Sequence, residues 1–299
     1  MKMLVYGALN IDLVFPVDHI VRPGETISAG DFRRSAGGKG SNLAAALAKA
    51  GAPVYLAGKI GRDGEFLLEL LRSYKVDTSL VAMYEGATGN AFIQVDKNGQ
   101  NAIVLFAGGN GAITVEEINT VLDTFGRDDI IMLQNEIVHG AEIITGAKQR
   151  GLRVCFNPSP YNEEIASLPL DLVDIFFVNE IEGAALAALK GNGTPDTNVP
   201  FPAILEKLVH QFPHAEIILT AGKEGAFYGY KDIRARGAVL DVPVVDTTGA
   251  GDTFSGYFIA ARARGRTVNE ALTLACKAAS IAVSRHGAME AVPSAGEVF

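Results

Sequence analysis

The chain has few cysteines, little positive charge and no long apolar run. Its 299 residues include two cysteines, Cys155 and Cys276, which lie far apart in apolar segments, and no Cys/His cluster has metal-ligand spacing. We therefore expect two reduced thiols inside the core. A formal net charge of −8 argues against a nucleic-acid or anionic membrane surface, because both need a basic patch. No stretch reaches the roughly 18 apolar residues of a membrane span, and the N-terminus lacks a signal-peptide pattern, which predicts a cytoplasmic protein.

Two common nucleotide-binding motifs are also absent. The segment SAGGKGSN has Lys39 but neither the spacing nor the following hydroxyl of a P-loop. Read from Gly38, it places Leu43 where a dinucleotide fingerprint needs its third glycine, and no hydrophobic strand precedes it. Gly37 and Gly38 instead allow the backbone to approach a ligand closely, while Asn42 offers both a donor and an acceptor. This combination suits recognition of a polyol.

Short β-branched runs alternate with longer amphipathic segments along the chain. Because the expected strands are nearly all apolar, they predict a mostly parallel sheet covered on both faces, a three-layer α/β/α fold with its crevice at the carboxyl ends of the strands. We expect one large domain over residues 1–299. The expected strands are 3–8, 54–60, 130–134, 152–158, 173–179 and 215–222, and the expected helices are 41–51, 65–74, 141–151 and 201–212.

Residues 12–34 and 88–109 do not fit this rhythm. The first segment carries Pro, Gly and alternating polarity, and the second resembles a hairpin that turns at DKNGQ, residues 96–100. Neither contains a crossover helix. We expect them to form a small antiparallel β-sheet that covers the crevice as a lid, and the alternative is an ordinary edge extension of the main sheet.

Two further motifs carry polar groups suited to chemistry. In GALNID, Asn10 and Asp12 are two residues apart, so both can face the same side of an extended segment and a carboxylate there can accept bonds from sugar hydroxyls. A turn cap is the alternative. In VVDTTGAGDTFSGYF, small residues precede Asp252 at the start of an apolar helix, where backbone N–H groups and the helix dipole attract an anion. Asp252 is then either a base or a simple helix cap.

Together, AGGKGSN near residue 40 and DTTGAGDTFSG near residue 250 resemble the paired signature of the ribokinase-like (PfkB) carbohydrate kinases. The likeness extends over essentially the whole chain, and NID, LQNE, VNEIE and SRHGA stand in the register of the members that phosphorylate ribose. The resemblance implies transfer of the γ-phosphoryl group of ATP to a primary sugar hydroxyl, most simply C5 of D-ribose. Alternatives are a kinase for fructose, a ketodeoxy sugar acid, a nucleoside or a sugar phosphate, or a non-catalytic sugar sensor.

The same resemblance assigns roles to residues. Asp252 becomes the general base, and the turn of Gly249, Ala250 and Gly251, with Thr248, becomes the anion hole for the transferred phosphoryl group. The sugar contacts that the resemblance implies are Asn10, Asp12, Gly38, Lys39, Asn42 and Glu136.

For the nucleotide and metals, the resemblance implies that Asn179 and Glu182 organise Mg²⁺ and its waters. The other implied nucleotide contacts are Thr220, Gly222, Gly225, Thr248 and Gly251, with adenine near Cys276 and Ser280. A monovalent cation, K⁺, is implied beside Asp246, Thr248, Ala282, Arg285 and Gly287. Ala291 stands where related kinases often have a serine, which removes one cation ligand. Relatives also pair through their lids, so a homodimer is expected.

Overall fold

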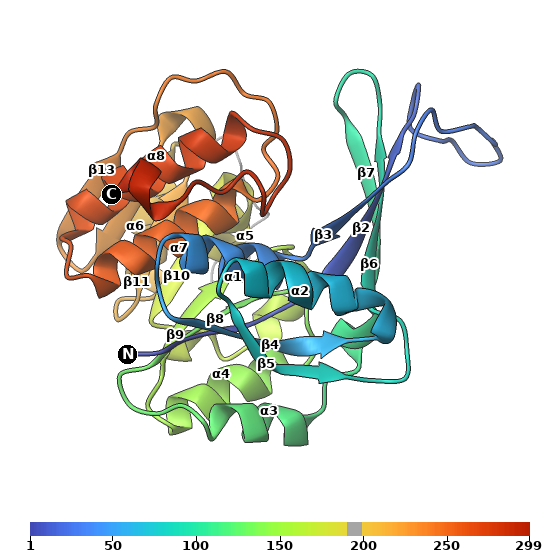
Figure 1. Cartoon of the computed structure of the whole chain (residues 1–299). Coiled ribbons are helices and arrows are strands. Elements are labelled where there is room, and N and C mark those ends of the chain that lie inside the picture. Colours follow the sequence, from blue (N-terminus) through green and yellow to red (C-terminus); the bar gives the residue numbers. More distant parts are fainter. Residues whose placement is uncertain (190–198) are drawn as a thin grey trace.

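The computed structural model describes residues 1–189 and 199–299, which build two β-sheets and flanking helices (Figure 1). The larger sheet has the strand order β13-β12-β11-β10-β9-β8-β1-β4-β5, and the smaller sheet has the order β3-β2-β6-β7. In the larger sheet only the pairs β11–β12 and β12–β13 are antiparallel. The expected three-layer α/β/α fold with a separate small sheet is therefore confirmed, and the edge-extension alternative is wrong.

The strands of the larger sheet agree closely with the apolar runs of the sequence. Strand β8, IIMLQ, is buried at all five positions because helices cover both faces of the sheet. The bounds of these strands are β1 Met3–Tyr6, β4 Val54–Ile60, β5 Asp77–Met83, β8 Ile130–Gln134, β9 Arg153–Asn157, β10 Ile175–Asn179, β11 Glu216–Thr220, β12 Ala226–Tyr230 and β13 Ile233–Gly237.

Helices lie on both faces of this sheet, each with its own hydrophobic core. On one face pack α1 (Lys39–Lys49), α2 (Glu65–Ser73), α7 (Ala250–Ala263) and α8 (Val268–Val283). On the other pack α3 (Val115–Leu122), α4 (Gly140–Gln149), α5 (Glu180–Ala188) and α6 (Phe201–Gln211). The two thiols are free and buried as expected. Among the described residues, no helix combines the length and apolarity needed to cross a bilayer.

The smaller sheet projects from the main body beside α1 and α2 (Figure 1). It consists of β2 (Asn10–Pro16), β3 (Arg33–Gly37), β6 (Gly89–Val95) and β7 (Asn101–Phe106). The β6–β7 hairpin turns through residues 96–100, where the Asp96 N–H donates to the Gln100 carbonyl at 2.9 Å. Its outer pairs are antiparallel, but the central pair β2–β6 is parallel, so the expectation of a wholly antiparallel sheet needs this correction.

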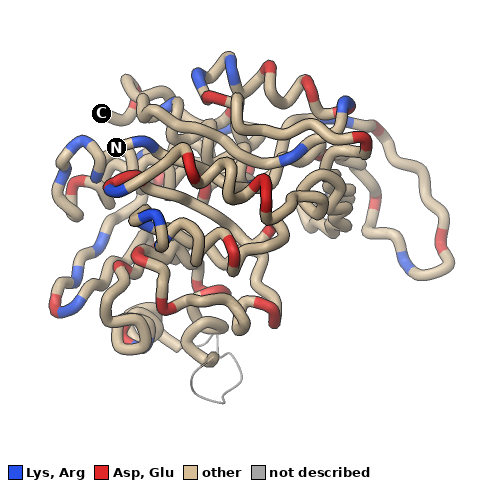
Figure 2. Tube along the Cα trace, turned by 90° about the horizontal axis from the view of Figure 1, so that it is seen from below, with Lys and Arg blue, Asp and Glu red and all other residues tan. Residues whose placement is uncertain are grey.

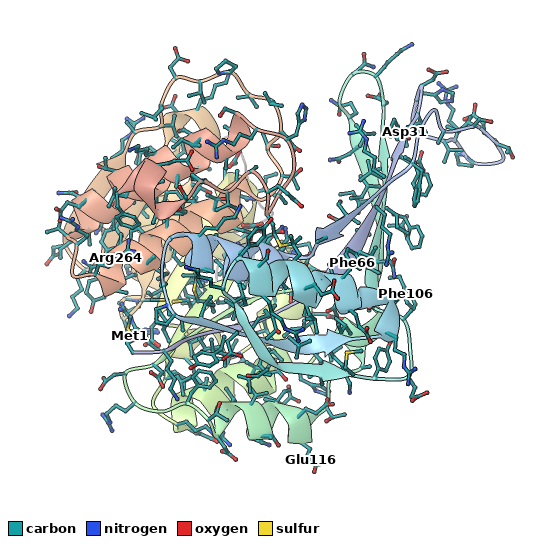
Figure 3. The ribbon with its side chains drawn as sticks, viewed as in Figure 1. Met1, Asp31, Phe66, Phe106, Glu116 and Arg264 are labelled. Carbon is teal, nitrogen blue, oxygen red and sulfur yellow. The ribbon has the colours of Figure 1, made fainter. Side chains whose placement is uncertain are left out.

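Lys, Arg, Asp and Glu positions are interspersed along the described chain (Figure 2). On the small sheet and at its base, Figure 3 places Asp31 on the outer part and Phe66 and Phe106 near the junction with the main body. At this junction Arg34 of β3 donates to the Asp63 carbonyl at 2.7 Å and lies over the Phe66 ring at 4.3 Å. The side chain of Arg34 thus ties the small sheet to the main body.

Candidate active site

The polar residues expected to contact substrate follow two neighbouring strands. Strand β1 lies between β4 and β8, at the point where the strand order reverses. The order runs through β4 and β5 on one side of β1 and through β8 to β13 on the other. Such a reversal opens a crevice at the carboxyl ends of the strands in doubly wound sheets. Asn10 begins β2 shortly after β1 ends, and Glu136 lies two residues beyond the end of β8. The strand order therefore places both residues at the crevice.

Helix α1 brings Lys39 and Asn42 to the same place. Gly38 precedes the helix with φ of 93°, a left-handed conformation that favours glycine. The backbone N–H of Lys39 donates to Oε2 of Glu136 at 3.0 Å, so a carboxylate caps the positive end of the helix. This bond joins the glycine loop to the residue after β8.

Asp12 depends on the small size of Gly37, which lies on the adjacent strand. A Cβ atom at Gly37 would lie 2.1 Å from Oδ2 of Asp12. The glycine therefore gives the carboxylate the space that it occupies. Asn10 is held in turn by Asn110, whose Nδ2 donates to Oδ1 of Asn10 at 2.7 Å.

Asp252 lies in the first turn of α7. Gly249 is the N-cap with φ of 71°, and the first intrahelical bond runs from the Thr253 N–H to the Gly249 carbonyl at 2.8 Å. The N–H groups of Gly251 and Asp252 come before that bond and have no intrahelical acceptor. Gly251 is exposed, and no atom lies within 4 Å of the position a Cβ would take. An anion can thus reach the helix end from outside while Asp252 is buried beneath it.

The two ends of the site meet at Asn42 and Lys39. Nδ2 of Asn42 donates to Oδ2 of Asp252 at 3.3 Å. Burial lowers the pKa of Lys39, but the charges of Asp252, Glu136, Glu182 and Asp12 outweigh it and the pKa is raised. One lysine is therefore surrounded by four carboxylates, and its ammonium group balances part of their charge.

Burial dominates the protonation of these carboxylates. The pKa of Asp252 is raised to about 6. Burial is the largest cause, Lys39 lowers the pKa, and the charge of Glu136 adds to the rise. Burial raises the pKa of Asp12 to about 7, with added repulsion from Glu136 and Glu290. The pKa of Glu136 is also raised by burial, against the attraction of Lys39. A carboxylate with a pKa near 6 is a stronger base than a solvated one, yet it is ionised at neutral pH.

A cavity of about 250 Å³ includes Glu136 and Asn10 in its lining, whereas Asp12, Lys39, Asn42 and Asp252 do not line it. Its polar lining comes from Asn10, Asn110, Asn135 and Glu136, and Phe106 and Val138 are part of its apolar wall. One water needs about 10–15 Å³ on this measure, so the cavity has room for a small polyol. Another cavity, of about 100 Å³, is lined by Met1, Arg153 and Glu216 and contains none of the predicted site residues.

Asn179 and Glu182 form the start of α5. The Asn179 side chain accepts from the N–H groups of Ile181 and Glu182, and Oε2 of Glu182 accepts from the Asn179 N–H at 3.0 Å. This reciprocal capping box explains the N-x-x-E spacing structurally. It leaves Oε1 of Glu182 without a role in the cap, and the carboxylate acts electrostatically on both Lys39 and Asp252. The residue therefore fits a water-mediated magnesium contact as well.

The predicted phosphate and ribose contacts follow β11 at the same edge of the sheet. Thr220 ends this strand, and its hydroxyl donates to the Val178 carbonyl at 3.3 Å. Gly222 is exposed and Gly225 is buried, with φ of 48° and 87°. The structure brings these residues to the end of the sheet that also carries Asn179, since β10 and β11 are parallel neighbours.

The residues expected around a monovalent cation lie close together. Oδ1 of Asp246 accepts from the N–H and hydroxyl of Thr248 at 2.9 and 2.6 Å, and its Oδ2 accepts from the Gly287 N–H at 3.1 Å. These bonds hold the pKa of Asp246 low despite its partial burial. Ala282 lies in α8, and Arg285, just beyond it, donates to Glu297. The Asp246 carboxylate therefore fastens two loops.

Cys276 and Ser280, which are expected near adenine, are both buried in this structure. Their exposures are 1% and 3%, because α8 packs against the end of β13 and the segment after it. A Cβ at Gly237 would lie 2.9 Å from Sγ of Cys276, and the Ser280 hydroxyl accepts from the Leu240 N–H at 2.9 Å. Both side chains are thus used in packing.

Three polar residues at the site were not predicted from the sequence. Asn110 accepts from the Leu9 N–H at 3.1 Å in addition to holding Asn10. Gln134 and Asn157 end β8 and β9, and each has a buried amide oxygen without a hydrogen-bond partner. For Gln134 and Asn157, the position at the carboxyl ends of parallel strands was the available signal.

Comparison with known proteins agrees with this geometry. The model of the pfkB family of carbohydrate kinases matches residues 1–295. The ribokinase of Staphylococcus aureus is 32% identical over 310 aligned residues, which cover 99% of this chain and 98% of the relative.

Two solved structures are similar over nearly their full length. A ribokinase from Cryptococcus neoformans in complex with ADP is 35% identical with a TM-score of 0.87, and 99% of this chain and 98% of that chain are covered. An Arabidopsis thaliana ribokinase in complex with ribose and ATP is 27% identical with a TM-score of 0.82, covering 99% and 97%.

The fold and the site define a carbohydrate kinase, with a carboxylate cluster beneath a small projecting sheet. The chain belongs to the pfkB family of carbohydrate kinases. The family expected from the two glycine-rich motifs is thereby confirmed.

Proposed function

We propose that the protein transfers the γ-phosphoryl group of ATP to the C5 hydroxyl of D-ribose, giving ribose 5-phosphate and ADP. The observation that carries the proposal is the buried Asp252 at the open N-terminus of α7, linked through Asn42 and Lys39 to Asp12 and Glu136. In this proposal a base, an anion site and polyol acceptors share one crevice. The names of the similar proteins, ribokinases, support the choice of ribose.

Asp12, Asn10, Lys39, Asn42 and Glu136 bind the sugar in this proposal. The side-chain oxygen of Asn10 accepts from Nδ2 of Asn110, so the NH₂ group of Asn10 remains available as a donor, while Asp12 accepts from hydroxyls. Charge-assisted bonds to adjacent hydroxyls orient the sugar, and orientation removes much of the entropic barrier to transfer.

Asp252 takes the proton of the attacking sugar hydroxyl. The oxygen of that hydroxyl then bonds to the γ-phosphorus, and the bond between this phosphorus and the oxygen that leaves with ADP breaks. The raised pKa makes the carboxylate a competent acceptor for that proton. The N–H groups at the start of α7, in the turn of Gly249, Ala250 and Gly251, stabilise the charge of the transferred group. The hydroxyl lies between the carboxylate and the anion site, so Asp252 does not face the phosphate directly.

Thr220, Gly222, Gly225 and Thr248 are the proposed nucleotide contacts, and Glu182 with Asn179 is the proposed site for the waters of Mg²⁺. Bound Mg²⁺ would neutralise phosphate charge during transfer. For K⁺, we propose backbone carbonyls around Asp246 and Gly287, because the Asp246 carboxylate is already engaged.

We further propose that the small sheet acts as a lid and as the interface of a homodimer. Its exposed apolar side chains support this, since a sheet edge and face of this kind are usually covered. They include Phe32, Phe92, Ile103, Val104, Leu105 and Phe106.

The alternatives within the family meet specific obstacles. A sugar phosphate needs free cations, and of Arg22, Arg33 and Arg34 the structure engages Arg34 with the Asp63 carbonyl and Arg33 in an exposed ion pair with Asp31 at 3.5 Å. A nucleoside needs an aromatic clamp; Phe15 and Phe32 pack on each other with ring centroids 5.3 Å apart, which leaves Phe106 as the aromatic side chain at the cavity. Ribose needs neither feature.

A coupled ADP-release assay with Mg·ATP, with and without K⁺, tests the proposal across ribose, deoxyribose, fructose, ketodeoxygluconate, nucleosides and fructose phosphates. Strong preference for ribose is the expected result. Preference for another compound would overturn the substrate, and silence across the panel would revive a non-catalytic sugar sensor. Omitting K⁺ tests the cation site separately.

A further inference from the structure

Two buried amide oxygens close to Asp252 lack a hydrogen-bond donor. Gln134 Oε1 and Asn157 Oδ1 have no partner, and Gln134 is only 3% exposed. Nε2 of Gln134 donates to the Lys39 carbonyl at 3.4 Å, which fixes the amide with its oxygen as the unpaired end. Buried acceptors of this kind are rare in folded proteins and call for a missing donor.

Both residues line one small cavity. Its volume is about 10 Å³, and Asp252 and Ser255 of α7 line it as well. A single water needs about 10–15 Å³ on the same measure and two or more polar partners. Leu43 and Phe177 are among the apolar walls, and burial raises the pKa of the lining thiol, Cys155, so that it stays protonated.

We propose that this cavity holds one ordered water molecule, and that Gln134 and Asn157 are positioning residues that act on Asp252 through it. The inference rests on the proposed function for its catalytic meaning, because that function makes Asp252 the base. The water itself would satisfy the two unpaired oxygens whatever reaction the protein performs.

A count of hydrogens gives the water its effect. When Asp252 is ionised, the two amide oxygens and the carboxylate compete for the two hydrogens of the water, and one acceptor is left short. When Asp252 carries a proton, its O–H donates to the water, whose own hydrogens then satisfy both amides. In this proposal the Ser255 hydroxyl donates to the water, so its hydrogen does not reach the amides. The arrangement therefore favours Asp252 after it has taken the proton of the sugar hydroxyl.

Charged groups from other elements also act on Asp252. Lys39 at the start of α1 lowers its pKa, whereas Glu136 after β8 and Glu182 of α5 raise it. Asn157 and Gln134 are both neutral, so replacing either residue by Leu leaves these charges unchanged.

The test is a titration of Asp252 in the free protein, followed by ¹³C NMR of labelled aspartate and assigned with Asp252→Asn. In Asn157→Leu, one acceptor is gone and the water can donate to the ionised carboxylate, so the midpoint should fall by about one pH unit. Gln134→Leu should act in the same direction and serves if Asn157→Leu does not fold. Met132→Leu, which changes an apolar residue of the same cavity, is the control and should leave the midpoint unchanged.

A midpoint that is unchanged or higher in both variants would overturn the inference. So would a crystal structure of the free protein in which the cavity is empty or holds a cation in place of water. These measurements need no substrate, so their failure is distinct from failure of the proposed function, which turnover by Asp252→Asn decides separately.

Discussion

Replacing Asp252 by Asn should lower turnover by orders of magnitude and at the same time stabilise the protein at neutral pH. Burial raises the pKa of this carboxyl from its ordinary 3.8 to about 6. The folded state therefore prefers the neutral form, which Asn imitates in shape and hydrogen bonding. A rise of about two pH units means that ionised Asp252 lowers the unfolding free energy by roughly 3 kcal/mol.

The pH window follows from the sign of the shift. Below about pH 4, Asp252 is protonated in both the folded and the unfolded chain, so the variant should gain nothing. The cost of ionisation grows between about pH 4 and 6 and is fully present above pH 6. The advantage of Asp252→Asn should therefore rise across this window and stay constant above it.

Urea unfolding of both proteins at pH 4, 5, 6 and 7.5 measures this difference directly. Asp18→Asn is the matched control, because Asp18 is exposed and its replacement should change the unfolding free energy by less than about 0.5 kcal/mol. Turnover of Asp252→Asn should fall by about 10²–10⁴, the usual contribution of a general base. If Asp252→Asn were less stable than the unmodified protein at pH 7.5, the burial argument would be refuted.

Three further predictions concern the groups around this base. Gly37→Ala should lower kcat/KM for the sugar at least tenfold without changing KM for ATP, because its Cβ would lie 2.1 Å from Oδ2 of Asp12. Gly30→Ala, in open space, is the control and should have no effect. Equal losses for sugar and ATP would contradict the assignment of Asp12 to the sugar. Lys39→Met removes the cation that lowers these carboxyl pKa values, so the acidic limb of the pH profile of kcat/KM should move up by about one pH unit, and an unmoved limb would refute its electrostatic role. Glu182→Gln should raise the Mg²⁺ concentration for half-maximal rate by about 10–100-fold. Urea unfolding of that variant should be near normal, since Gln also completes a capping box, and an unchanged Mg²⁺ dependence would remove Glu182 from the metal site.

The fold was largely predictable from local sequence pattern. Strands β4 and β8 lie at the predicted residues, because apolar β-branched runs in a sheet covered on both faces leave little choice of boundary. The parallel pairing of β2 with β6 was not predictable in the same way. Its register joins segments about 80 residues apart and depends on where the main sheet delivers each strand.

The candidate site was predictable where residues belong to a glycine-rich motif, and less so elsewhere. Asp252, Lys39 and Asn42 lie within such motifs, and the structure brings them together. The burial of Cys276 depends instead on packing against Gly237, some forty residues away, which no local pattern reveals. The unpaired oxygen of Gln134 likewise follows from three-dimensional packing, because the sequence does not show whether a hydrogen-bond donor will face an amide at the end of a strand.

The central claim is tested most directly by identifying the product formed from D-ribose and Mg·ATP with ³¹P NMR, using the unmodified protein and Asp252→Asn side by side. The account predicts ribose 5-phosphate and ADP in equal amounts from the unmodified protein and almost none from the variant. Formation of ribose 5-phosphate by Asp252→Asn at an undiminished rate, or of free phosphate alone by the unmodified protein, would contradict it.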